Sequence, residues 1–198
     1  VLRGSSALLH GGSAIGGVVN VIDRSIPTSP YDLPGGSITS SYNSANEGLN
    51  YGMMAFGSSD KLSFQVNGFK RDINDYDTPV FYTEDHHTNA ISGPFQKVEN
   101  SHSKTSSIGF GGSYMLDSGY AGLSFSSYSN DYGVPGEHAE SDTLIEMESY
   151  RFECRSEIEI TDSDWLTGIE LNFGYGDYKH SESGYETENN VTEWHTHS

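Results

Sequence analysis

The sequence predicts an all-β fold, a partial antiparallel transmembrane β-barrel. Short segments alternate strictly between apolar and polar residues, which is typical of strands with one apolar and one polar face. After the third segment, the connections between these segments alternate between long and short. No apolar run is long enough for a transmembrane helix, and barrel strands do not need one.

The composition fits folded strands and an acidic surface. Hydrophobic residues make up 34% of the 198 residues and the formal net charge is −18, a combination also found in disordered chains. The 13 Tyr and 9 Phe argue against disorder, because disordered chains contain few aromatic residues. The chain has no basic patch, so nucleic acid is not expected as a partner. Its negative charge makes cations the expected partners. The single Cys154 excludes an internal disulfide.

Seven segments carry the strand pattern, and an eighth begins near Asn190. In the third segment Leu62, Phe64 and Val66 alternate with polar residues. In the sixth segment, apolar and small residues from Tyr150 to Ile160 alternate with Arg and Glu. The seven expected strands cover residues 36–42, 49–57, 61–71, 108–114, 121–126, 150–160 and 169–176.

The lengths of the connections predict which end of the sheet lies outside the cell. Tight turns are expected near 58–60, 116–119 and 161–164, and long loops near 72–103, 131–148 and 180–192. Short turns on one side and long loops on the other are typical of outer-membrane barrels. Two other architectures fit the alternation: a soluble β-sandwich with its charged face in water, and a self-standing eight-stranded barrel.

The chain opens on a glycine-rich stretch that differs from the strand segments. Glycine pairs surround short apolar runs before residue 18, and a short buried strand from Val18 to Ile22 is expected after them. Pro27 and Pro30 break that strand. The predicted division is therefore an N-terminal unit at 1–27, a linker at 28–35 and the strands at 36–198.

The glycine-rich stretch resembles the C-terminal end of the plug domain of TonB-dependent outer-membrane receptors. The family usually has Pro where this chain has Ser5, and often Tyr where it has His10. The residues that carry the resemblance are Arg3, Gly4, Gly11, Gly16, Gly17 and Asn20.

The resemblance implies a location in the bacterial outer membrane, in contact with lipid and lipopolysaccharide. It also implies a barrel of about 22 strands, of which this chain would hold seven or eight. The implied function is active uptake of a scarce nutrient, driven by the inner-membrane TonB complex. A passive porin or a surface-adhesion barrel is the alternative of another class. No catalytic constellation is present, so an enzyme is not expected.

Histidine and acidic residues gather in the predicted long loops, and they predict a metal as substrate rather than as a resident cofactor. Neutral imidazole and carboxylate are the ligands that zinc and neighbouring divalent metals prefer. A ferric siderophore or other metal chelate is the alternative substrate, for which the aromatic stretch from Tyr76 to Phe95 would be suited. The candidate metal ligands are His86, His87, His102, Glu137, His138, His180, Glu182, His195 and His197.

Two further stretches, 131–138 and 176–182, are similar to a subgroup of the family that includes zinc-uptake receptors. The loop that follows residue 131 is short here and carries only His138. The cysteines of the subgroup's loop are missing, because Cys154 falls inside a strand. The resemblance therefore supports transport more strongly than it supports zinc.

Overall fold

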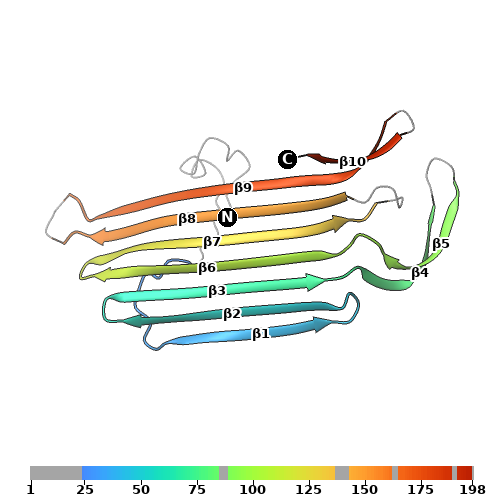
Figure 1. Ribbon diagram of the computed structural model, residues 1–198. Coiled ribbons are helices and arrows are strands. Elements are labelled where there is room, and N and C mark those ends of the chain that lie inside the picture. Colours follow the sequence, from blue (N-terminus) through green and yellow to red (C-terminus); the bar gives the residue numbers. More distant parts are fainter. Residues whose placement is uncertain (1–23, 85–88, 137–142, 162–164, 189–190, 198) are drawn as a thin grey trace.

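A computed structural model gives the fold of residues 24–84, 89–136, 143–161, 165–188 and 191–197, and the backbone alone for 185–188 and 191–197. Within these residues the structure is all-β (Figure 1). None of its described segments is a helix of the length and apolar character needed to cross a membrane. The strands are β1 (Gly35–Asn43), β2 (Gly48–Ser59), β3 (Leu62–Ile73), β4 (Tyr76–Glu84), β5 (Ile91–Val98), β6 (Ser103–Leu116), β7 (Gly119–Val134), β8 (Thr143–Glu159), β9 (Gly168–Glu188) and β10 (Val191–His197).

Eight of these strands form one antiparallel sheet in the order β1-β2-β3-β6-β7-β8-β9-β10. The seven expected strands are β1, β2, β3, β6, β7, β8 and β9, and β10 begins at Val191, next to the expected start near Asn190. The all-β prediction is confirmed. Within the described residues the sheet is open, with β1 at one edge and β10 at the other.

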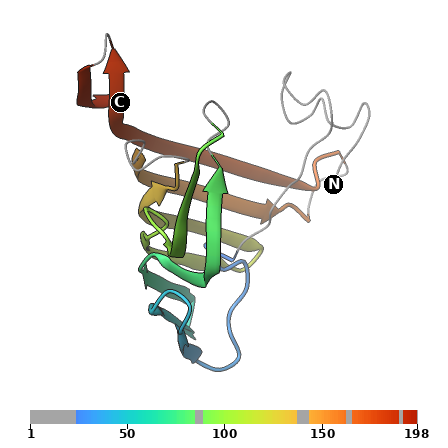
Figure 2. The same ribbon diagram turned by 90° about the vertical axis from the view of Figure 1, so that its right-hand side faces the viewer.

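The predicted loop boundaries need correction, because strands extend into all three long connections. Residues 72–103 contain a separate hairpin of β4 and β5, which bends away from the main sheet (Figures 1 and 2). Strand β7 continues to Val134 and β8 begins at Thr143, so the 131–148 connection is short. Residues 180–188 belong to β9. In β4 the apolar residues are consecutive at 79–82 instead of alternating, and residues 180–188 are mostly polar, so neither stretch gives an alternating hydrophobic signal.

One face of the main sheet, the apolar face, is exposed although it is hydrophobic. Strand partners lie on the same side of a sheet, so the ladder register defines its members. Leu123, Phe173 and Leu171 have exposed fractions of 52%, 62% and 63%. The apolar face carries Leu62, Phe64, Val66, Ile108, Phe110, Leu123, Phe125, Phe152, Cys154, Leu171, Phe173 and Tyr175.

The opposite face, the polar face, carries small and hydrophilic residues and holds most of the buried groups. Buried Ser63, Ser113 and Ser124 lie on it, together with buried Met115 and Tyr120. Polarity is therefore reversed relative to a soluble sheet, in which the apolar face is covered. The polar face carries Ser63, Gln65, Asn67, Gly109, Gly111, Ser113, Gly122, Ser124, Ser126, Arg151, Glu153, Arg155, Asn172 and Gly174.

The apolar face has a limited height along the strands. On β6 it runs from Leu116 to Ile108, and the next residue on the same face is Ser106. Beyond that row the same face carries Lys104 and Glu146. Nine residues of strand span about 27 Å. With a strand tilt of about 40°, this band would be about 20 Å high, close to the lipid-facing band of an outer-membrane barrel.

The two ends of the sheet differ in the connections that they carry (Figure 1). Short turns join β2 to β3 and β6 to β7, and Lys61 and Asp117 in these turns form an exposed ion pair at 2.6 Å. The hydrogen bond of this pair raises the pKa of Lys61 and lowers that of Asp117. The β4–β5 hairpin, the connection after Val134 and the β9–β10 hairpin lie at the other end.

Asn100 holds the strands together at the long-connection end. Its side-chain amide nitrogen donates to the backbone carbonyl oxygens of Val134 and Thr143, each at 2.9 Å. Asn100 thus bridges the end of β7 and the start of β8. Its φ of 56° lies in the left-handed region that Asn adopts more readily than most residues. Asn100 therefore fixes the point at which this connection leaves the sheet.

Replacing Asn100 by Gly should loosen this point without straining the backbone, because Gly keeps the left-handed conformation and removes both side-chain hydrogen bonds. Each lost bond is worth roughly 0.5–1.5 kcal/mol. Amide hydrogen exchange at 143–146 should become faster, while exchange in β6 stays unchanged. Unchanged exchange at 143–146 would show that Asn100 does not hold these strands.

Candidate functional site

Residues 24–34, here called the docked segment, lie against the polar face of the sheet (Figure 2). The hydroxyl of Ser113 donates to the carbonyl oxygen of Pro27 at 2.6 Å, and the amide of Tyr31 donates to the hydroxyl of Ser58 at 2.8 Å. Ile26 is 2% exposed and forms a small apolar cluster with Met115 and Tyr120. These contacts are concentrated at residues 25–27, the end of the predicted N-terminal unit. In the predicted linker, Tyr31 contacts the sheet, whereas 28–30 and 32–34 are exposed.

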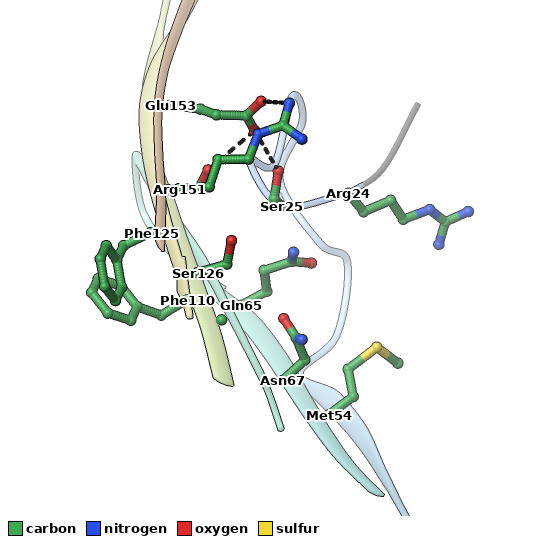
Figure 3. Close-up of a pocket in the computed structure, with 12 residues that line it drawn as sticks. Arg24, Ser25, Met54, Gln65, Asn67, Phe110, Phe125, Ser126, Arg151 and Glu153 are labelled. Carbon is green, nitrogen blue, oxygen red and sulfur yellow. Dashed lines mark hydrogen bonds and ion pairs between the residues drawn. The ribbon is translucent and has the colours of Figure 1, made fainter. Parts of the chain in front are cut away.

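Glu153 is the charged centre of this contact. Its carboxylate accepts hydrogen bonds from Ser25 at 3.3 Å and from Ser124 at 3.5 Å, and it pairs with the guanidinium of Arg151 (Figure 3). The Glu153 side chain is only 14% exposed. A carboxylate with so little exposure requires partners of this kind, since an unpaired charge would be costly to bury. Glu153 therefore joins the docked segment to two strands.

Two glycines of the sheet, which have no side chain, let the docked segment approach closely. A Cβ atom on Gly111 would lie 1.7 Å from the carbonyl oxygen of Ser25, and one on Gly122 would lie 2.4 Å from Ile26. Both glycines lie on the polar face. Nothing in the sequence alone indicates which segment these two glycines accommodate.

A hollow of about 340 Å³ lies beside this contact. Figure 3 shows Arg151 and Glu153 on the side of the sheet that faces the docked segment, and Phe110 and Phe125 on the opposite side. The polar lining contains two guanidinium groups, one carboxylate and two carboxamides, which suit water and polar solutes. These groups belong to Arg24, Gln65, Asn67, Arg151 and Glu153.

The predicted metal ligands divide into three groups. His86, His87, Glu137 and His138 lie outside the described residues, as do the plug-motif residues at 1–23, including the expected strand from Val18 to Ile22. His102 lies 3.4 Å from the carboxylate of Asp75, which also accepts the amide of Ser101 at 2.8 Å. His180, Glu182, His195 and His197 all lie on β9 and β10.

The β9–β10 hairpin therefore brings together four of the candidates, and it adds Glu residues that the sequence prediction did not include. Glu186 is paired with Glu193 in the ladder. The alternation of His and Glu with Ser and Thr within 180–188 and 191–197 is the sequence signal that could have identified these Glu residues. Among the side chains that the structure describes, which end at Gly184, no group of three or more His, Cys, Asp or Glu is arranged to hold a metal ion.

Comparison with known proteins does not identify a family for this chain. No family model matches its sequence, and no curated protein matches it at a significant level. The features that bear on function are therefore the two faces of the sheet, the docked segment and the β9–β10 hairpin.

Replacing Gly111 by Ala should displace the docked segment, because the added methyl group would collide with the Ser25 carbonyl. Trypsin should then cleave the bond after Arg24 several-fold faster, measured by mass spectrometry on the folded protein. Gly112→Ala is the matched control, since the nearest atom to its added methyl group is 3.4 Å away. Equal cleavage of the two variants would contradict this docking.

Proposed function

We propose that the protein is part of a TonB-dependent receptor of the bacterial outer membrane and contributes the end of its plug and the first strands of its barrel wall. The observation that carries the proposal is the reversed polarity of the sheet. An apolar face of limited height suits lipid, and a polar face suits a water-filled interior. A soluble sandwich would expose its polar face and cover its apolar one.

The docked segment supports the same proposal. The chain reaches β1 from the polar face, on which Ser25, Pro27 and Tyr31 form hydrogen bonds. A plug that fills a barrel has to connect to the wall from the inside, which is the polar side. A self-standing eight-stranded barrel would have little room for such a segment, because its interior is just wide enough for its own side chains.

For the transported substrate we propose zinc or another divalent metal ion. The His and Glu residues of the β9–β10 hairpin favour this class, because their side-chain types are zinc ligands. A metal chelate such as a ferric siderophore is the second candidate. It is favoured by the aromatic residues of the β4–β5 hairpin, in which the rings of Phe81 and Phe95 are 5.6 Å apart and Tyr82 is 62% exposed.

Replacing Leu123 or Phe173 by Arg should block assembly of the barrel. Both residues lie in the central row of the apolar face. An Arg at the bilayer midplane costs about 2–4 kcal/mol. The measurement is the heat-dependent shift in gel mobility that folded outer-membrane barrels show. Ser126→Arg on the polar face is the control and should assemble normally, whereas normal assembly of all three variants would contradict the face assignment.

Uptake of labelled zinc and of a labelled ferric siderophore by cells that make the protein tests the transport proposal. Uptake should stop when TonB is deleted or when a protonophore collapses the proton-motive force. Uptake that continues under both treatments would instead indicate a passive porin. Cells that take up neither substrate under any condition would point to an adhesion barrel.

A further inference from the structure

The β9–β10 hairpin has two chemically different faces. The ladder pairs His197 with Glu182, His195 with Gly184 and Glu193 with Glu186, without a register shift. Paired residues share a face, and so do residues two apart along a strand. One face, here called the His–Glu face, therefore carries His180, Glu182, Gly184, Glu186, Glu188, Val191, Glu193, His195 and His197.

The other face of the hairpin carries neither His nor acidic residues. It consists of Ser, Thr and aromatic residues, namely Ser181, Ser183, Tyr185, Thr187, Thr192, Trp194 and Thr196. All three histidines and all four glutamates of residues 180–197 thus fall on one face. This separation is a property of the register, because a shift of one residue would exchange the faces of one strand.

Described side chains show that the alternation is regular where the hairpin begins. The rings of Tyr178 and His180 lie 5.8 Å apart, as residues on the same face of a strand should. The hydroxyl of Ser181 lies on the other face, where it donates to the carboxylate of Glu146 at 3.3 Å. His180 and Glu182 are both exposed, so neither is buried beneath another element.

The Glu residues give the hairpin a negative charge that a bound cation would offset. Glu186 and Glu193 are direct ladder partners, and like charges in that relation destabilise a strand pair. After Lys179 the sequence contains no Lys or Arg that could compensate for the glutamates. A divalent metal would neutralise this repulsion, and the neighbouring His residues would supply the nitrogen ligands that distinguish a transition-metal site from a calcium site.

We propose that the His–Glu face of the β9–β10 hairpin is a binding site for a divalent transition metal, with zinc as the reference ion. His197, Glu182 and His195 form the centre of the site. Glu182 and His197 are ladder partners, and His195 lies two residues from His197 on the same face. Cβ atoms of direct partners are about 5 Å apart. Metal binding here would order the hairpin, since the ligands come from both of its strands. The inference goes beyond nutrient uptake and does not depend on it.

Zinc titration of the full chain in detergent, followed by calorimetry and by the visible spectrum of bound cobalt, tests this site. Loss of a group that merely supports a ligand lowers metal affinity about 10–100-fold. His195→Ala with His197→Ala should therefore weaken zinc binding at least about 100-fold.

One control separates metal binding from folding. Thr192→Ala with Thr196→Ala changes the other face of β10 and should keep the affinity of the unmodified chain. If the double His variant proves unstable, hydrogen exchange of the unmodified chain provides the answer: zinc should slow exchange in 180–188 and 191–197 but not in β6.

The proposal is overturned if the unmodified chain does not bind zinc, if the double His variant binds it with unchanged affinity, or if zinc leaves exchange in the hairpin unaltered. These outcomes differ from a failure of the uptake proposal. A hairpin that binds zinc in cells whose zinc uptake is unaffected by loss of TonB would retain the site and remove the transport function.

Discussion

The structure depends on the alternation of side chains across an antiparallel sheet whose register continues without a bulge from β1 to β9. Because paired residues share a face, one unbroken register keeps every apolar residue of these strands on the same side. The result is a sheet whose hydrophobic side is exposed and whose polar side holds the buried Ser63, Ser113 and Ser124. Such an arrangement is unfavourable in water and favourable when one side faces lipid.

The docked segment gives the polar face a second role. Glu153 accepts hydrogen bonds from Ser25 and Ser124, and Gly111 allows the backbone of the segment to approach the sheet. These contacts are polar and close, so the segment is positioned by hydrogen bonds and by the lack of side chains rather than by a large apolar core. In the proposed receptor these contacts would anchor the end of the plug to the wall of the barrel.

Much of the fold could be predicted from the sequence because apolar alternation is a local signal. Segments such as Leu62–Val66 and Tyr150–Ile160 identify both a strand and its faces. The β4–β5 hairpin could not be found in this way, because its apolar residues are consecutive at 79–82 and its ladder has register shifts. The outer half of β9 was missed because its residues are mostly polar. The docking of Ser25 joins residues far apart in the sequence, and the opposition of Glu186 and Glu193 depends on the exact register of the hairpin. His180, Glu182, His195 and His197 were identified by residue type, but their common face was not.

The central claim is that the apolar face lies against lipid, and the single cysteine offers a direct test. Cys154 lies in the central row of that face, between Leu123 and Phe173. A spin label on Cys154 of the protein in bilayers should be readily accessible to oxygen and poorly accessible to a water-soluble nickel chelate. A label at Ser126→Cys, on the polar face of a Cys154→Ser variant, should show the opposite order. Greater accessibility of the Cys154 label to the nickel chelate than to oxygen would contradict the account.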